Sequence, residues 1–198
     1  MMIIDERLST FIDTLQWELP GELAELEQRA LSEQVPVIRR SMQTFLGFLL
    51  RLVQPMSVLE VGTAIGFSSI LMSEYLSPDA VITTIEKVPA RIAAAKENFS
   101  RYGKTGQITL LEGDASLILP ELASQGKQYG FIFMDAAKGQ YLNFLPDVLK
   151  MLEKDGILVT DNVLQDGDVI QSRYAVTRRD RTIHGRMREY LKSEAKRS

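Results

Sequence analysis

Tyr129-Gly-Phe-Ile-Phe-Met-Asp135 is an apolar run of strand length that ends on a carboxylate. A second run, Gly156-Ile-Leu-Val-Thr-Asp161-Asn162, ends on a carboxylate and an amide. Short apolar runs are typical of buried parallel strands, whose carboxyl ends lie at the edge of the sheet where ligands bind. We therefore expect Asp135, Asp161 and Asn162 to meet at one point. Three oxygen donors with room for water suit Mg²⁺, which prefers oxygen ligands in six-fold geometry.

Strand-like and helix-like stretches alternate from residue 57 onward. The strand-like runs are Val58–Gly62, Val81–Glu86, Ile108–Asp114, Phe131–Asp135 and Ile157–Asp161. The helical stretches between them are Phe67–Tyr75, Ala90–Tyr102, Leu117–Ala123 and Tyr141–Leu152. Helical patterns also precede them at Ile4–Leu19, at Glu22–Glu33 and in a segment from Pro36 that is apolar over Phe45–Val53. Strict alternation predicts an α/β fold with a mainly parallel, helix-covered sheet.

The composition is that of one globular domain. The chain has 198 residues, of which 45% are hydrophobic and 25% charged, and it has no cysteine, which excludes disulfides and thiolate metal sites. The N-terminus lacks a basic and then apolar leader, and no long apolar window suggests a membrane span. We expect a cytoplasmic protein without a membrane partner. Within the one domain, 1–54 would be a helical appendage, 57–163 the ligand-binding core and 171–198 a basic helical tail.

The net charge of −3 is unevenly distributed. Residues 171–198 carry nine basic side chains against three acidic ones, a net charge of +6, whereas the first 170 residues carry −9. An acidic body with a basic tail predicts a polyanionic partner that approaches from one side. The alternative is a solvated helix that keeps the protein in solution, and charge alone does not decide between them.

A glycine-containing turn, Glu60-Val-Gly-Thr-Ala-Ile-Gly-Phe-Ser68, follows the first strand and opens a helix. Glycines let a backbone approach a ligand closely, and a helix N-terminus offers free N–H groups. The dinucleotide pattern G-x-G-x-x-G is excluded, because Ala64 and Phe67 stand at its second and third glycine positions. Glu86 ends the second strand, where an acidic side chain commonly binds a ribose diol, and Asp114 would face the base. Alternatively, Glu60, Glu86 or Asp114 caps a helix.

With these motifs, and with Asp135-Ala-Ala-Lys-Gly-Gln-Tyr141 and Thr160-Asp-Asn-Val163, the chain resembles a known family. It is similar to the metal-dependent O-methyltransferases of the catechol and caffeoyl-CoA type, which use S-adenosylmethionine (SAM), over roughly residues 36–167. The resemblance implies a Rossmann-like methyltransferase sheet and Mg²⁺ or Mn²⁺ held by Asp135, Asp161 and Asn162. It also implies a general base, Lys138. The cofactor pocket that it implies comprises Glu60, Gly62, Ser68, Glu86, Asp114, Ala115 and Asp135.

Within this family, the chain looks most like the bacterial tRNA 5-hydroxyuridine methyltransferases. That likeness lies in the two metal-site motifs, in Gln165 where small-molecule relatives commonly have tryptophan, and in the arginine-rich segment that follows. It implies 5-hydroxyuridine at the wobble position of tRNA as the acceptor. The residues expected to contact RNA phosphates are Arg178, Arg179, Arg181 and Arg188. A small-molecule catechol-type enzyme and a non-catalytic nucleoside- or RNA-binding domain remain alternatives.

Four further expectations concern single residues and the C-terminal part. Lys138 would accept the acceptor's proton, although a plain ion pair with a neighbouring carboxylate is the alternative. His184 lies in the basic tail and is interpreted as a surface residue, and Trp17 as a core or interface anchor. Family members usually continue into two further strands, which are not apparent here. The fifth strand would then be an exposed edge, which favours a homodimer.

Overall fold

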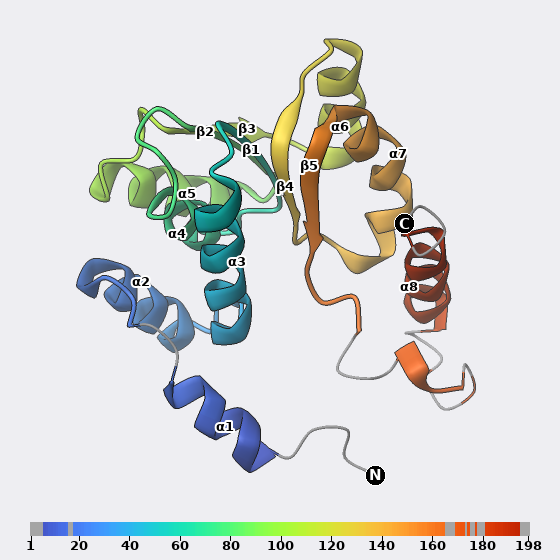
Figure 1. Ribbon diagram of the computed structural model, residues 1–198, viewed down its shortest axis with the longest axis horizontal. Coiled ribbons are helices and arrows are strands. Elements are labelled where there is room, and N and C mark those ends of the chain that lie inside the picture. The colour runs from blue at the N-terminus through green and yellow to red at the C-terminus, as the bar shows by residue number, and fades with distance from the viewer. Residues whose placement is uncertain are drawn as a thin grey trace.

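The computed structural model describes residues 6–15, 18–164, 169–172, 174, 177 and 181–194. Its centre is a five-stranded parallel sheet in the order β3-β2-β1-β4-β5 (Figure 1). The strands are β1 (Ser57–Val61), β2 (Val81–Glu86), β3 (Ile108–Glu112), β4 (Tyr129–Met134) and β5 (Leu152–Thr160). This confirms the α/β fold with a parallel, helix-covered sheet.

Helices cover both faces of the sheet (Figure 1). The helices among the described residues are α1 (Glu6–Thr14), which lies away from the sheet, α2 (Gly21–Ser32), α3 (Arg40–Val53), α4 (Phe67–Ser73), α5 (Pro89–Arg101), α6 (Ala115–Ser124), α7 (Tyr141–Met151) and α8 (Arg181–Glu194), with a short 3₁₀ helix η1 (Lys138–Gln140) before α7. Alternate strand residues face opposite sides, so that Val58 joins one apolar cluster and Leu59 the other. The first cluster also takes side chains from α2 to α5, and the second from α6, α7 and α8.

The register of the sheet brings the strand ends to one line. Met134 of β4 pairs with Val61 of β1 on one side and with Thr160 of β5 on the other. The backbone N–H of Asp135 then donates to the Val61 carbonyl over 3.1 Å, and that of Asp161 to the Met134 carbonyl over 3.0 Å. Asp135 and Asp161 therefore leave the sheet side by side.

Two elements differ from the sequence expectation. Strand β5 begins at Leu152, directly after α7, and contains a bulge in which Asp155 is left-handed, with a φ of 64°. Helix α1 ends at Thr14, before the expected Leu19, and its apolar residues Leu8 and Phe11 are more than half exposed. Within the described residues β5 pairs only with β4, and whether a second chain covers its other edge stays a prediction.

No helix among the described residues combines the length and the apolar character needed to cross a lipid bilayer. Trp17, expected to anchor a core or an interface, lies outside the described residues.

Candidate functional site

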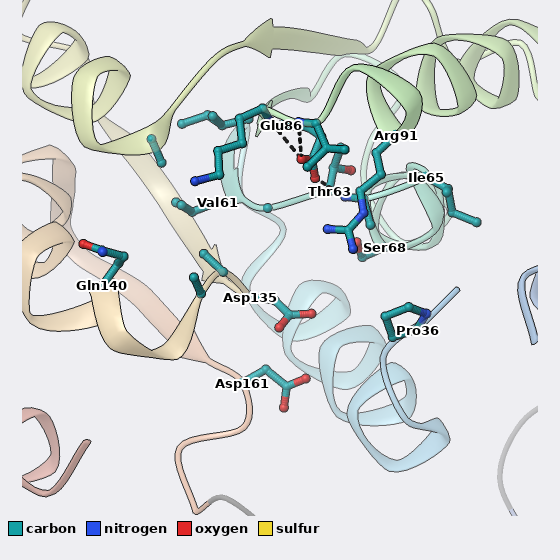
Figure 2. A pocket seen from close by; sticks show the side chains of 18 of the residues that line it. Pro36, Val61, Thr63, Ile65, Ser68, Glu86, Arg91, Asp135, Gln140 and Asp161 are labelled. Atoms are coloured by element: carbon teal, nitrogen blue, oxygen red, sulfur yellow. Dashed lines mark hydrogen bonds between the residues drawn. The ribbon is translucent and has the colours of Figure 1, made fainter. Parts of the chain in front are cut away.

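A cavity of about 610 Å³ opens at the carboxyl ends of the strands (Figure 2). This volume is in the usual range for cofactor and small-molecule sites. Its lining comes from the turns that follow β1, β2, β3, β4 and β5, together with residues 36–39 before α3. The predicted residues that line it are Gly62, Ser68, Glu86, Asp114, Ala115, Asp135, Asp161 and Asn162.

The turn after β1 needs glycine because other parts of the protein approach its backbone closely. Gly62 has a φ of +98°, and a Cβ atom there would overlap the carbonyl oxygen of Asp135. Gly66, with a φ of +86°, leaves space for the ring of Phe99 in the same way. The glycines thus let the turn approach β4 and α5, whereas the sequence suggested only close approach to a ligand.

Glu86 links the turn after β1 to the turn after β2, which form two walls of the cavity. Its Oε2 accepts a hydrogen bond from the Ala64 backbone N–H at 3.0 Å, and its Oε1 accepts from Lys87 and Val88 at 2.8 and 2.9 Å. Ala64 has a left-handed φ of 49°, which this hydrogen bond supports. A carboxylate has about four acceptor positions, so Glu86 keeps one for a ligand.

Asp114 has the helix-capping role that the sequence left open. It is the N-cap of α6, where its Oδ1 accepts the Ser116 backbone N–H at 2.9 Å, and its Oδ2 lies 3.1 Å from Lys87 Nζ. The hydrogen bonds from Ser116, followed by Lys87, lower the pKa of Asp114 to about 2. Asp114 is therefore a fixed negative charge in the cavity wall at neutral pH.

Asp135 and Asp161 place their carboxylates on the same side of the cavity (Figure 2). Burial raises the pKa of Asp135 to about 7, and the charges of Asp161 and Glu60 add to this rise, whereas Lys138 opposes it. Asn162, whose φ of 58° is left-handed, donates its backbone N–H to Asp161 Oδ1 over 2.7 Å. The predicted meeting of two carboxylates and one amide is thus present.

The donor set suits a hard cation, although it is small. No group of three or more His, Cys, Asp or Glu side chains is gathered as a metal site anywhere in the part of the chain that the structure describes. A divalent cation would depend on two carboxylates and the Asn162 amide, whose oxygens match the preference of Mg²⁺ and Mn²⁺. Its charge would also offset the burial and, after it, the repulsion from Asp161 that raise the pKa of Asp135. Metal binding stays a prediction.

Glu60 differs from the sequence expectation, because it does not line the cavity. It is fully buried and accepts hydrogen bonds from Ser69 and Thr84. Burial raises its pKa, and the surrounding hydroxyl groups, that of Ser68 first, oppose the rise. Its link to the cavity is through Ser68, which does line the wall. The reason is strand periodicity, since Glu60 shares the face of β1 that α4 covers.

Lys138 lies in η1 and is half-buried, but it is not among the residues that line the cavity. Its charge lowers the pKa of the nearby Asp135. Within the described residues no carboxylate lies close enough to form an ion pair with it, so the plain ion-pair alternative finds no support. Its role as general base stays a prediction.

The basic tail is only partly described. Arg178 and Arg179 lie outside the described residues. Arg181 and Arg188 share a face of α8, seven residues apart, and neither lines the cavity. The expectation for His184 is wrong, because it is only 1% exposed. His184, Met187 and Tyr190 recur at every third position and form the buried face of α8, a pattern that the sequence contains.

Three basic side chains line the cavity that the sequence reasoning did not select, namely Arg39, Lys87 and Arg91. Figure 2 shows Arg91 of α5 turned toward Ser68. Lys87 and Arg91 follow the end of strand β2 at Glu86 and lie near the start of α5, at the edge of the sheet where ligands bind. This position could have identified both residues from the sequence. Arg39 has no such signal, because it reaches the cavity from a segment that is distant in sequence.

Comparisons with known proteins agree with this geometry. The family model described as O-methyltransferase matches residues 16–196. A catechol O-methyltransferase from Mycobacterium tuberculosis is 30% identical over 166 residues, 82% of this chain and 74% of that enzyme. Another from Niastella koreensis is 35% identical over 127 residues, 64% of this chain. That match spans only 58% of the Niastella enzyme's length.

Solved structures show the same fold. A Staphylococcus aureus protein assigned as a caffeoyl-CoA O-methyltransferase has a TM-score of 0.83 and 30% identity, with 95% of this chain and 88% of that chain covered. The O-methyltransferase TomG from Streptomyces achromogenes, in complex with SAM, has a TM-score of 0.83 and 25% identity, with 100% and 89% covered. On these grounds, the chain belongs to the O-methyltransferase family of the catechol and caffeoyl-CoA type.

Proposed function

We propose that this chain binds SAM in the cavity and transfers its methyl group to a hydroxyl that has a second oxygen beside it. The observation that carries the proposal is the shared cavity, which joins Glu86 and Asp114 to the pair Asp135 and Asp161 (Figure 2). Glu86 and Asp114 suit a nucleoside, whereas Asp135 and Asp161 suit an acceptor that is held through a cation. The SAM-bound structure of TomG, which shares the fold, supports the choice of cofactor.

At the cofactor end, Glu86 is held rigidly by three backbone N–H groups and has about one acceptor position left for a ribose hydroxyl. Ser68 and Arg91 line the same cavity and suit the polar amino-acid part of SAM. Because Glu86 is already fixed before a ligand arrives, binding costs less ordering of the site.

At the acceptor end, transfer forms an O–CH₃ bond and breaks the S–CH₃ bond, and the hydroxyl proton passes to Lys138 in its neutral amine form, which becomes an ammonium group. A divalent cation bound by Asp135, Asp161 and Asn162 would supply positive charge that orients and acidifies the hydroxyl. Burial first, and then the charge of Asp161, raise the pKa of Asp135, and a bound cation would offset both effects.

Two acceptor classes fit this chemistry. The first is a small catechol-like molecule, because the relatives described above are named catechol O-methyltransferases. The second is 5-hydroxyuridine in tRNA, which offers the same pair of adjacent oxygens. The +6 charge of residues 171–198 favours this second class, since phosphates attract basic side chains.

The deciding experiment measures methyl transfer from SAM to catechol, to free 5-hydroxyuridine and to tRNA that carries unmethylated 5-hydroxyuridine. Each acceptor is tested with Mg²⁺, with Mn²⁺ and with excess chelator. We expect turnover with at least one acceptor and its loss in chelator. Full activity in chelator would contradict the metal proposal, and a lack of transfer to all acceptors would contradict the proposed function. A strong preference for tRNA over the free nucleoside would place the RNA acceptor first.

A further inference from the structure

Helix α8 packs against α7 and η1 with its buried face (Figure 1). His184, Met187 and Tyr190 are each no more than 2% exposed, whereas Arg186 lies exposed beside them. The ring of Tyr190 lies 5.7 Å from that of Tyr141, centroid to centroid. The helix is therefore a packed part of the domain in addition to being a carrier of basic charge.

One contact of α8 reaches the segment that holds Lys138. The Nη1 atom of Arg186 donates to the carbonyl of Gly139 over 2.6 Å. A Cβ atom placed on Gly139 would lie 3.9 Å from Cγ1 of Ile183, so the loop also has an apolar neighbour on α8. Gly139 directly follows Lys138, and a shift of its carbonyl would move the lysine backbone with it.

A second contact reaches the strand end that holds Asp161. The hydroxyl groups of Tyr190 and Thr160 are 2.6 Å apart, and Thr160 directly precedes Asp161. Tyr141, which packs on Tyr190, donates its hydroxyl to the Asp161 carbonyl over 3.2 Å. The first contact ends on Thr160, the neighbour of Asp161, and the second on the backbone of Asp161 itself, while neither tyrosine lines the cavity.

We propose that Arg186 and Tyr190 are positioning residues, which hold Lys138 and Asp161 at the spacing that methyl transfer requires. The inference rests on the proposed function and deepens it, because it assigns α8 a role in orienting the site. Supporting groups of this kind typically change activity by about 10- to 100-fold when they are removed. A misplacement of about 1 Å at a reacting group has a similar cost.

The test compares Arg186→Ala with Lys192→Ala, which removes the same charge from an exposed position of the same helix. For Arg186→Ala we expect kcat with free 5-hydroxyuridine or catechol to fall about tenfold, with KM for SAM within about twofold of the parent. Lys192→Ala should keep the parent kcat, and Arg186→Lys should recover part of the loss. Equal losses in the two alanine variants would overturn the proposal, because charge and not position would then matter.

Tyr190→Phe provides a second variant that keeps the ring contact and removes only one oxygen atom. It should lower kcat with little change in thermal stability, and an unchanged kcat would overturn the role of Tyr190.

Amide hydrogen exchange, measured by mass spectrometry on the ligand-free protein, supplies a readout that does not depend on activity. Arg186→Ala should raise exchange in residues 138–140, and Tyr190→Phe in residues 160–162, while 81–86 stay as in the parent. Unchanged exchange in both segments would refute the positioning role. If the parent methylates no acceptor but exchange rises as expected, the proposed function fails and the positioning contacts stand.

Discussion

Replacing Asp135 by asparagine should stabilise the metal-free protein at neutral pH although it ends methyl transfer. The pKa of Asp135 rises from 3.8 to about 7 in the folded protein, because burial and then the charge of Asp161 disfavour the ionised form. The folded state thus holds this proton more tightly than the unfolded state. The resulting contribution to stability is fully present below pH 3.8 and is lost as the pH rises through 7.

The size of the effect follows from the size of the shift. A rise of about three pKa units corresponds to about 4 kcal/mol at about 1.4 kcal/mol per unit. Asparagine keeps the shape of the side chain and removes the charge. We expect the asparagine variant to have a free energy of unfolding about 1–2 kcal/mol higher than the parent at pH 8. The gain is smaller than the full penalty because water relaxes part of it at a side chain that is not fully enclosed. For a chain of this length, that is a rise in Tm of about 2–8 °C.

The assay is thermal unfolding in excess chelator from pH 4 to pH 8, with Asp79→Asn as the control at an exposed carboxylate. The rise in Tm caused by Asp135→Asn should be small at pH 4, grow with pH and level off above pH 7. Asp79→Asn should change Tm little at any pH. Excess Mg²⁺ at pH 8 should stabilise the parent more than the variant. A gain of equal size at pH 4 and pH 8, or none at pH 8, would refute the reasoning.

Three further outcomes are expected. Lys138→Met should lower kcat about 10²-fold with little change in SAM affinity, since a positioned base is removed, and steady-state kinetics with a normal kcat would exclude that role. Gly62→Ala should destabilise the protein by about 2 kcal/mol or more in urea titrations, because its φ is +98° and its Cβ would meet the Asp135 carbonyl. Replacing the arginines at positions 178, 179 and 181 with alanine should lower the slope of log K for tRNA against log salt by about one unit per lost phosphate contact. An unchanged slope would leave the small-molecule acceptor in first place.

The sequence sufficed to predict the parallel sheet and several of the polar residues that lie at its edge. An apolar run that stops on a polar residue marks both a buried strand and the side chain that leaves it, and so the positions of Asp135 and Asp161 could be read directly. The same reasoning placed Glu86 and Asp114 at the cavity. It also offered helix capping as an alternative, and Asp114 does cap α6.

The sequence reasoning failed for residues whose position depends on which face of a strand or helix they occupy and on what packs against that face. Glu60 precedes the end of β1, and only the hydroxyls of Ser69 and Thr84 reveal that it is turned into the protein. His184 lies in a strongly basic stretch, and composition outweighed the three-residue spacing that buries it. Arg39 reaches the cavity through tertiary contacts that no local pattern encodes.

Because β1, β4 and β5 are joined by their backbone ladder up to the last residue, the distance between the backbones of Asp135 and Asp161 is set by the spacing of neighbouring strands, about 4.8 Å. Thermal motion of the surrounding loops should hardly alter it. The wall formed by residues 36–39, in contrast, is a loop segment that contributes nothing to this ladder. The cavity therefore combines an edge fixed by the sheet with a wall made of loop, and we expect changes at 36–39 to alter which acceptor the proposed enzyme takes while the backbones of Asp135 and Asp161 keep their spacing.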